Sequence, residues 1–373
     1  MVYDVIFPYV VGGVQLRNWE LAKRLSGRGH EVTLFGMKHW PGPAIVEREG
    51  VRLHGVCSPR ELYRNGRRAF LPPIYTGLRT LAPLLRERYD LIDVANFPYF
   101  PFFSAKIATL TQRSRLVVTW IEVWGSYWQE YLGKAGLVAR AIEKVCANGT
   151  TNAVAISDMT KRDLRRIGYR GPVEVIGCGV DVAGVTSVGA SAAASDVVFF
   201  GRLIKEKNAD LLIRAIALLA KDLPEVRCLI VGDGPARDGL VSLIHDADLQ
   251  RQVRVVPFVR DHAEVFATMK ASKVLVLPSS REGFGITALE ANACGLPVIT
   301  TRYPRNACCD LIRNGENGFV CEPSDGEVAE RIRQVLVGAG PSPSDCARSA
   351  ARYDWDALAT AVERYYQRVG TRA

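Results

Sequence analysis

The stretch SSREGFGITALEANACG, residues 279–295, decides both the expected fold and the expected site. An apolar run, KVLVLPS, precedes it, and a helix-like run follows and ends at Gly295. Gly283 and Gly285 therefore fall at a strand-to-helix corner, where the lack of Cβ atoms lets backbone N–H groups approach a ligand closely. The start of the helix near Gly285 offers unpaired N–H donors and a positive dipole end, which together suit a phosphate group.

Two carboxylates, Glu282 and Glu290, stand eight positions apart in this stretch. Glu290 falls in the second turn of the expected helix, near enough to accept two hydrogen bonds from a ribose diol. Glu282 lies in the loop, where it can hold the hydroxyls of a second sugar. The alternative is that Glu282 is a solvated side chain and that Glu290 is an ion-pair partner on the helix.

A second candidate loop lies in FFGRLIKEKNADLL, where an apolar strand pattern ends at Gly201. Arg202 and Lys207 stand five positions apart around the strand-to-helix loop that follows, so both can point at one pyrophosphate. Arginine supplies a planar fork of donors and lysine a point charge. Surface arginines and lysines are common, and the interpretation depends on the glutamates expected in the same domain.

A third turn lies in PYVVGGVQLRNWELA, where Gly12 and Gly13 come between the first strand pattern and the first helix pattern. The spacing is not G-x-G-x-x-G, so the dinucleotide-binding fingerprint is absent. A Gly-Gly turn can still present N–H groups to an anion or admit a substrate close to the backbone. The alternative is an ordinary tight turn.

Composition limits the class of protein. The 373 residues suggest two domains, and 48% hydrophobic with 23% charged residues is the balance of a soluble globular enzyme. No run of eighteen apolar residues occurs, so we predict no transmembrane helix, and the N-terminal MVYDVIFPYV is typical of a first strand rather than a signal peptide. The nine cysteines form no C-x-x-C pair and the five histidines are scattered, so we expect reduced cysteines in a cytosolic protein and no metal site.

The net charge of +9 favours an anionic partner. Nucleotide phosphates, an acidic membrane surface and nucleic acid all meet this description. No nucleic-acid-binding motif occurs, so we expect no nucleic-acid partner.

Strand and helix patterns alternate in both halves of the chain, which predicts parallel sheets covered by helices on both sides. In the first half the expected strands are YDVIFP, HEVTLFG, DLIDVANF, RLVVTWIE, TNAVAIS and VEVIG, and VQLRNWELAKRL is the first expected helix. In the second half they are DVVFFG, RCLIVG, QVRVVPF, KVLVLPS, PVITT and GFVCEP. Each domain is thus expected to be a doubly wound α/β sheet with ligands at the carboxyl ends of its strands.

The expected domain limits follow from the change in composition near the middle of the chain. Residues 184–195 are rich in small residues without a period, which is typical of a linker. We therefore predict an N-terminal domain at 1–183, a C-terminal domain at 196–350, and a cleft between them. A last helix, within 351–373, follows the second domain.

These stretches together resemble the retaining glycosyltransferases of family four, which have the GT-B fold. The likeness covers nearly the whole chain and also includes GHEVTLF, AISDMTKRDL, CGVDV, VGDGP, ACGLPVIT and NGENGF. The resemblance implies two doubly wound domains facing across a cleft, with a nucleotide sugar on the C-terminal domain and the last helix, around Trp355, returning to the N-terminal domain. The implied catalytic residues are Arg202, Lys207 and Glu282, and the implied substrate-binding residues are Gly12, Gly13, Glu122, Gly283, Phe284, Gly285, Ile286 and Glu290.

The resemblance also implies an activity. A hexose would pass from a UDP- or GDP-sugar to a lipid-linked, glycan or other cell-surface acceptor with retention of configuration, without an essential metal and without a cofactor beyond the donor itself. The expected location is the cytoplasm, with peripheral contact at the inner face of the membrane as a further expectation. The rivals are a sugar-nucleotide epimerase or a phosphorylase, although no motif argues for a pyridoxal phosphate lysine, and a nucleotide-sugar-binding homologue that has lost catalysis.

Two positions depart from the family pattern. VVTWIEVWGSYWQEYLG resembles a segment in which relatives often have T-W-H-E-x-W, with the histidine against the donor sugar, and this chain has Ile121 at that position. The isoleucine side chain neither hydrogen-bonds nor carries charge, so we expect weaker catalysis or a different sugar geometry. Cys178 replaces an asparagine, which we expect to be harmless. Trp124 and Trp128 in this segment line a sugar site or belong to the core.

The acceptor side is suggested by SPRELYRNGRRAFLPPIYTGLRT, in which basic and apolar residues alternate. The basic residues are Arg60, Arg64, Arg67 and Arg68, and the apolar ones are Leu62, Tyr63, Phe70 and Leu71. Such a mixture suits an anionic membrane surface or a lipid-phosphate acceptor, and a solvated basic loop is the alternative.

Overall fold

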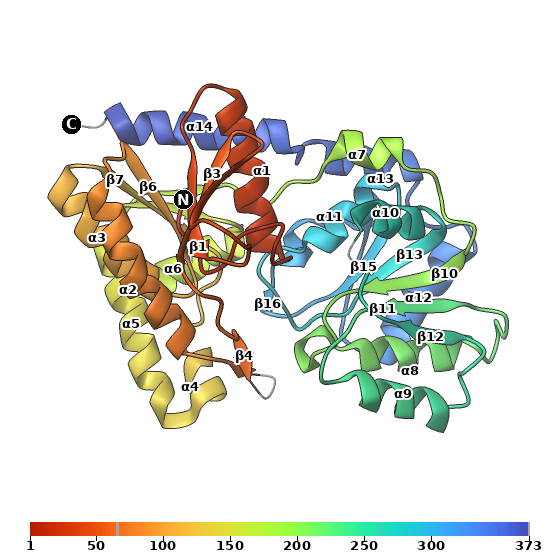
Figure 1. Cartoon of the computed structure of the whole chain (residues 1–373). Helices are drawn as coiled ribbons and strands as arrows, with labels where there is room; N and C mark the ends of the chain where they lie inside the picture. Colours follow the sequence, from red (N-terminus) through yellow and green to blue (C-terminus); the bar gives the residue numbers. More distant parts are fainter. Residues whose placement is uncertain (65–66, 260, 372–373) are drawn as a thin grey trace. The chain divides into compact units, whose positions relative to one another are not determined.

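The computed structural model describes residues 1–64, 67–259 and 261–371, without the side chains at 63–64 and 67–68 (Figure 1). The chain divides into two compact units. Met1–Cys178 and Trp355–Ala373 form the first, and Gly179–Asp354 forms the second. The expected basic residues Arg64, Arg67 and Arg68, and Tyr63 beside them, have side chains outside the described part.

The second unit is built on six parallel strands. In hydrogen-bonding order they are β12 (Val253–Val256), β11 (Cys228–Val231), β10 (Ser195–Phe200), β13 (Ser272–Leu277), β15 (Val298–Thr301) and β17 (Gly318–Cys321). Counted along the chain, this is the doubly wound order 3-2-1-4-5-6. The order reverses between β10 and β13, and ligands of such sheets bind at the carboxyl ends of the strands that flank this reversal.

Helices cover both faces of this sheet, which is why its strands are apolar along most of their length (Figure 1). One layer contains α8 (Ala209–Leu219), α9 (Arg237–Asp246) and α12 (Asp325–Leu336). The other contains α10 (His262–Lys270), α11 (Ile286–Ala293) and α13 (Pro343–Ala351). The remaining elements are α7 (Val182–Ser187), the short parallel pair β14 (Arg281–Glu282) and β16 (Arg305–Asn306), and the 3₁₀ turns Lys205–Lys207 and Ala307–Asp310.

The first unit contains a second, mostly parallel sheet. One part has β2 (Ile45–Arg48), β3 (Val51–Cys57) and β1 (Thr33–Met37), and the other has β6 (Leu91–Asn96), β7 (Arg115–Trp120), β8 (Asn152–Ala155) and β9 (Val173–Val175). Only β2 runs antiparallel in this sheet, because a tight hairpin joins it to β3. A separate small hairpin is formed by β4 (Tyr63–Arg64) and β5 (Arg67–Arg68).

The prediction of a regular first strand at YDVIFP is wrong. Val2 makes isolated parallel bridges to Phe35 of β1 and to Val94 of β6, and so joins the two parts of the sheet. The chain turns from Asp4 onward, so the segment is too short to count as a strand although it lies where the first strand was expected. Its backbone amides still donate into the sheet, at 2.8 Å from Val2 to Asp93 and at 3.1 Å from Tyr3 to Phe35.

The helices of the first unit form two groups. α1 (Gly13–Gly27) packs against α14 (Trp355–Thr371), while α2 (Leu71–Arg86) packs against α3 (Phe100–Gln112), which also contacts α5 (Gly136–Gly149). α4 (Tyr127–Leu132) precedes α5, with a 3₁₀ turn at Gly133–Ala135 between them, and α6 (Asp158–Arg166) follows β8. No helix in the described ranges is long and apolar enough to cross a membrane.

The C-terminal helix α14 is held on the first unit by side chains along its whole length. Arg24 of α1 contacts Asp356 at 2.6 Å, and Arg28 contacts Glu363 at 2.8 Å. The hydroxyl of Tyr365 donates to the carbonyl oxygen of Ala153 at 3.2 Å. The last residues of the chain therefore complete the unit that the first residues begin.

The expected linker at 184–195 has more structure than its composition suggested. Its first residues belong to α7, where the Asp181 side chain accepts from the amide of Gly184 and caps the helix. Lys270 donates to the carbonyl oxygens of Val185 and Val188 at 2.6 Å each, which ties this segment to α10 within the second unit. The prediction of two doubly wound α/β domains is confirmed, and the division between the two units lies at Cys178 and Gly179.

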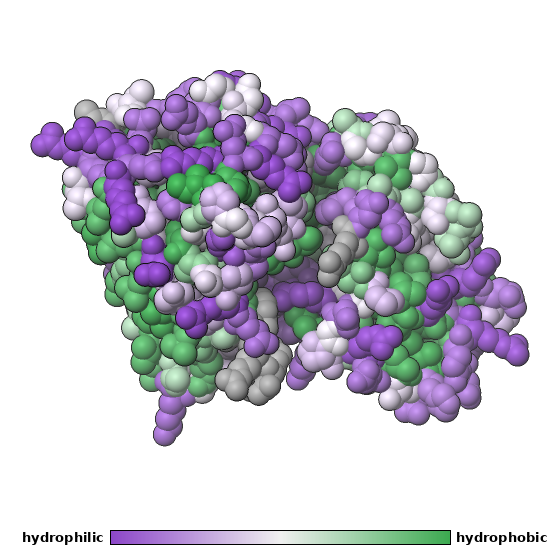
Figure 2. All heavy atoms as spheres, in the orientation of Figure 1, coloured by the Kyte–Doolittle hydropathy of each residue, from purple (hydrophilic) through white to green (hydrophobic). Residues whose placement is uncertain are grey.

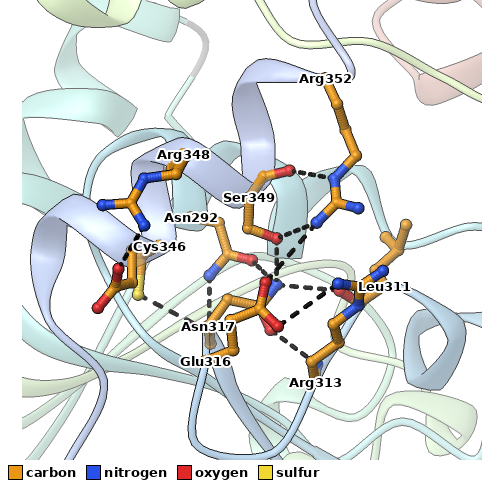
Figure 3. Close-up of polar contacts among 10 residues, drawn as sticks. Asn292, Leu311, Arg313, Glu316, Asn317, Cys346, Arg348, Ser349 and Arg352 are labelled. Atoms are coloured by element: carbon orange, nitrogen blue, oxygen red, sulfur yellow. Dashed lines mark hydrogen bonds and ion pairs between the residues drawn. The ribbon is translucent and has the colours of Figure 1, made fainter.

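A buried polar network fixes the C-terminal end of α11 (Figure 3). The side-chain amide of Asn317 donates to Asn292 of α11 and to Ser349 of α13 at 2.9 Å each, and its oxygen accepts from the amide of Arg313 at 2.7 Å. Asn292 in turn donates to the backbone oxygen of Asn317 at 2.9 Å. Both asparagines are buried, so the loss of either leaves partners without hydrogen bonds in a dry environment.

We predict that Asn317→Ala lowers the free energy of unfolding of the second unit by about 3 kcal/mol, because Asn292, Ser349 and the Arg313 amide lose a buried partner together. Urea denaturation measures the change. The control Asn148→Ala removes an exposed asparagine of α5 and is expected to change stability by less than about 0.5 kcal/mol. Equal effects of the two substitutions would contradict a structural role for the network.

Candidate active site

Two loops meet where the strand order of the second unit reverses. One follows β10 and carries Glu206, Lys207 and Asn208, and the other follows β13 and begins at Pro278. The side chain of Asn208 donates to the Pro278 carbonyl oxygen at 3.0 Å, and the amide of Ser280 donates to the Glu206 carbonyl oxygen at 2.9 Å. These bonds hold the two predicted loops together as one edge of the sheet.

An ion pair lies at the centre of this edge, between Lys207 Nζ and Glu282 Oε1. The two side chains are only 17% and 13% exposed, so water screens their attraction less than it would at an open surface. The hydroxyl of Ser279, which is fully buried, donates to the same oxygen of Glu282 at 2.8 Å. The sequence predicted both charged residues for the site, but not their contact and not Ser279.

The backbone around Glu282 is also fixed. Glu282 belongs to β14, where it pairs with Asn306 of β16. The side chain of Asn306 is buried and donates to Thr300 Oγ1 at 2.9 Å and to the Thr301 carbonyl oxygen at 2.8 Å. The backbone that carries the carboxylate is therefore held by β-pairing and does not lie in an irregular loop.

The turn before Lys207 is formed by close packing of backbone on backbone. A Cβ on Gly232 would lie 2.0 Å from the carbonyl oxygen of Gly201, and one on Gly234 would lie 2.4 Å from that of Leu203. Only glycine tolerates these approaches. They fix the backbone on both sides of Arg202, whose side chain is exposed.

α11 begins at a strand-to-helix corner, as the pair Gly283 and Gly285 predicted. Gly285 is the N-cap with φ +106°, a conformation that disfavours other residues, and α11 has no side-chain cap among the described residues. Phe284 is buried, with its ring centroid 6.1 Å from that of Tyr353, and so anchors the turn between Gly283 and Gly285. The first turn of α11, beginning at Ile286, is thus positioned to direct amide groups out of the loop.

Glu290 lies on α11, in a different environment from Glu282 of β14. Burial raises the pKa of its carboxyl group from 4.5 to about 7. His262 at the start of α10 lies beside it, with Nδ1 3.8 Å from Oε1 of Glu290. This distance is too long for a hydrogen bond, so the histidine compensates for burial only weakly. His262 was not among the predicted site residues.

The remaining predicted residues belong to the first unit. Gly12 precedes α1 as its N-cap and Gly13 is its first residue. Glu122 follows β7, and its Oε2 accepts from the indole nitrogen of Trp124 at 2.7 Å. Ile121, at the same strand end, packs against a small cluster that contains Tyr3 and Met37.

Glu143 of α5 holds the segment after β7 in place, a role that no sequence motif indicated. It is fully buried and accepts from the amides of Trp124 at 2.7 Å and Gly125 at 2.8 Å, and from the hydroxyl of Tyr99. Trp128 is buried in the aromatic cluster around Trp124, as core residues are, while Trp124 itself is half-buried.

No group of three or more His, Cys, Asp or Glu side chains that could hold a metal ion occurs in the described part of the chain. The nine cysteines are free and seven of them are buried. The edge of the second unit's sheet presents Lys207, Arg202, two carboxylates and the amides at the start of α11.

Family comparison agrees with this architecture. A profile described as Glycosyltransferase Family 4 matches residues 11–183, and one described as Glycosyl transferases group 1 matches residues 190–353. The fold and the two profiles define a glycosyltransferase with the GT-B fold. The two profiles cover most of the chain between them, and the chain belongs to family four of the glycosyltransferases. The resemblance found in the sequence is confirmed.

Two curated relatives match different lengths of the chain. Glycogen synthase of Mycobacterium tuberculosis is 31% identical over 179 residues, a match that covers 46% of this chain and only 42% of that protein. D-inositol 3-phosphate glycosyltransferase 2 of Catenulispora acidiphila is 27% identical over 400 residues, which cover 96% of this chain and 90% of that protein.

Solved structures share the fold at low identity. Sucrose-phosphate synthase from Thermosynechococcus elongatus matches with a TM-score of 0.81 at 20% identity, over 97% of this chain and 95% of that one. HepE of Anabaena in complex with UDP-glucose matches with a TM-score of 0.73 at 20% identity, over 97% of each chain. At this level of identity the likeness shows the fold alone.

The burial of Glu290 predicts a pH dependence of stability. Its pKa is higher in the folded than in the unfolded chain, so the folded state binds the proton more tightly, and the free energy of unfolding falls as pH rises from about 4.5 to about 7. The contribution is at most about 3 kcal/mol. Urea denaturation of the parent and of Glu290→Gln between pH 5 and pH 8 isolates it, because all other groups titrate in both proteins. Parallel stability curves for the two would contradict the assignment.

Proposed function

We propose that this chain transfers a hexose from a UDP- or GDP-sugar to a glycan, a lipid-linked sugar or another cell-surface acceptor, with retention of the anomeric configuration. The observation that carries the proposal is the Lys207–Glu282 pair at the point where the sheet order reverses. Family membership supports glycosyl transfer, and relatives named for glycogen and inositol phosphate chemistry, with a neighbour solved with UDP-glucose, support a nucleotide-sugar donor.

The proposed roles follow from charge and position. Lys207, Arg202 and the first turn of α11 take the diphosphate, because two cations and a helix N-terminus favour negative charge. Glu290 takes the ribose diol, whose two hydroxyls are the donors that this buried carboxyl lacks. Glu282 takes hydroxyls of the donor sugar, together with the backbone of Gly283.

The proposed mechanism needs no protein base. As the anomeric C–O bond breaks, negative charge builds on the diphosphate, and Lys207, Arg202 and the amides of α11 stabilise it from fixed positions. The acceptor hydroxyl attacks from the face that the diphosphate leaves, and an oxygen of the departing phosphate takes its proton. Exclusion of water limits hydrolysis of the donor. Metal independence belongs to the same proposal.

Glu282 has a second effect on Lys207. Without a donor, the carboxylate holds the ammonium group in one place and compensates its partial burial. An arriving diphosphate then meets a cation that is already oriented, so less reorganisation accompanies charge development. This is why we assign Lys207 to turnover more than to affinity.

The proposal is tested with Lys207→Ala in a transfer assay with UDP- and GDP-hexoses. We expect turnover to fall by about 10²–10³, with a much smaller change in donor affinity, because the partner charge grows only as the bond breaks. The matched control is Lys205→Ala, which removes an exposed lysine from the same 3₁₀ turn and is expected to leave turnover within a few-fold. Thermal melts establish that each variant is folded.

Activity is measured with and without EDTA, and with donor alone. Full loss in EDTA that Mg²⁺ or Mn²⁺ restores would overturn metal independence. Conversion of the donor without an acceptor would favour an epimerase over a transferase. Turnover of Lys207→Ala within a few-fold of the parent would remove the diphosphate role.

A second candidate function is a nucleotide-sugar-binding protein with weak or no catalysis. The observation that favours it is Ile121, an apolar side chain at the carboxyl end of β7, where cleft ligands of such sheets lie. Binding of UDP- or GDP-sugars, seen as thermal stabilisation, without transfer to any acceptor would support it.

Ile121→His separates the two candidates. If the parent is a weakened catalyst, the new hydrogen bond to a sugar hydroxyl raises turnover by about tenfold to a hundredfold, since an unsatisfied polar group costs roughly 1–3 kcal/mol. Turnover is measured with several donor hexoses and one good acceptor. A loss with every donor would instead identify Ile121 as a specificity residue for a donor without that hydroxyl.

A further inference from the structure

Three helices on one side of the first unit expose an unusual amount of apolar surface. Of the seventeen large hydrophobic side chains that are exposed in the described part of the chain, eight lie on α2, α3 and α5. They are Leu71, Leu78 and Leu85 on α2, Ile107 and Leu110 on α3, and Leu137, Val138 and Val145 on α5. We call this set the apolar face. Large contiguous apolar patches of this kind mark interaction sites rather than ordinary surface.

The spacing on α2 shows that the exposure follows a helical stripe. Leu71, Ile74, Leu78, Leu81 and Leu85 recur every three or four residues, so they lie along one side of the helix. Leu71 is 76% exposed and Leu78 is 68% exposed. The opposite side of α2 is buried against the rest of the unit. One side of α2 is therefore buried and its outer side carries an apolar stripe, whereas a surface helix is normally polar on its outer side.

The neighbouring helices continue this surface. α2 packs against α3, and α3 contacts α5. Leu110 of α3 is 71% exposed, and Ile107 precedes it by three residues on the same side of the helix. Hydrophobic residues gather over the side of the molecule where α2 and α5 lie (Figures 1 and 2). The apolar face thus extends over several helices.

Every exposed charge on these three helices is positive. The exposed basic residues are Arg79 and Arg86 on α2 and Lys144 on α5, while Lys106 on α3 and Arg140 on α5 are half-buried. The one acidic residue, Glu143, is fully buried beneath Trp124 and Gly125. Two arginines stack on the ring of Tyr75, namely Arg79 of α2 and Arg60 of the segment before α2. This contact holds both guanidinium groups beside the apolar stripe of α2.

We propose that the apolar face docks this chain on the surface of an anionic lipid bilayer. Apolar side chains enter the boundary between headgroups and acyl chains, while arginine and lysine side chains reach the negatively charged headgroups. The charge pattern selects this partner over a second copy of the chain. A symmetric dimer would bring the same positive face against itself with no acidic side chain on these helices to pair with it.

The inference deepens the proposed function by assigning the acceptor to a membrane surface, and in that respect it rests on the proposed function. The two fail separately. Vesicle binding needs no donor and no catalysis, and sugar transfer to a water-soluble acceptor needs no membrane.

The test is co-sedimentation of the full chain with phosphatidylcholine vesicles that contain or lack phosphatidylglycerol. We expect binding to the anionic vesicles and much weaker binding to the neutral ones. The triple variant Leu71→Gln, Leu78→Gln, Leu110→Gln is expected to lower the partition coefficient by roughly tenfold or more, since three exposed apolar side chains no longer enter the interface. Arg79→Gln with Lys144→Gln is expected to lower binding to anionic vesicles by roughly tenfold.

A matched triple variant on the other unit, Leu218→Gln, Val241→Gln, Val337→Gln, removes three exposed apolar side chains away from the face and is expected to bind as the parent does. Equal loss in both triple variants, or no binding of the parent to anionic vesicles, would overturn the proposal. So would a parent dimer in sedimentation velocity that the face variant converts to a monomer while vesicle binding is absent. Transfer to a soluble acceptor should be unchanged in both triple variants.

Discussion

The edge of the second unit's sheet where the candidate site lies is organised around one contact, the ion pair between Lys207 and Glu282. It joins the loops that follow β10 and β13, the two strands between which the sheet order reverses. A pair this well covered is favourable only if both partners are held in place, because partial burial removes water from each charge. Ser279, the β14–β16 pairing and the Asn208–Pro278 bond provide that support. The geometry around the pair is therefore determined before any ligand arrives.

Glycines provide the space that this arrangement needs. The backbone near Gly232 and Gly234 approaches Gly201 and Leu203 so closely that any Cβ would collide with a carbonyl oxygen. Gly285 serves the other loop, since its positive φ turns the chain directly from β14 into α11. Each loop is thus shaped by backbone packing, and the charged side chains are placed as a consequence. The start of α11, which has no side-chain cap among the described residues, favours negative charge beside this sheet edge.

The sequence predicted the doubly wound fold because buried parallel strands are apolar throughout and alternate with amphipathic helices. It also placed Lys207, Glu282 and Gly285 at strand-to-helix corners, since local patterns determine where loops occur. It did not predict that Lys207 and Glu282, 75 positions apart, touch each other, because that contact depends on strand order. It missed His262 for the same reason. It expected a strand at YDVIFP, where the structure has the isolated bridges of Val2 to β1 and β6. The segment before Asp4 is too short to form a strand of its own, and β1 and β6 complete the sheet on either side of it.

Glu282 and Glu290 show how one motif supplies two kinds of carboxylate. Glu282 has a cation and a hydroxyl against one oxygen, and its charge is compensated within the protein. Glu290 has no such partner at hydrogen-bonding distance among the described residues, and burial raises its pKa to about 7. A carboxyl group in that state is stabilised by any group that donates hydrogen bonds to it, which is why we propose that a ribose diol binds there. The eight-residue spacing separates a carboxylate whose charge is compensated in the free protein from one whose burial no hydrogen-bond donor of the described residues compensates.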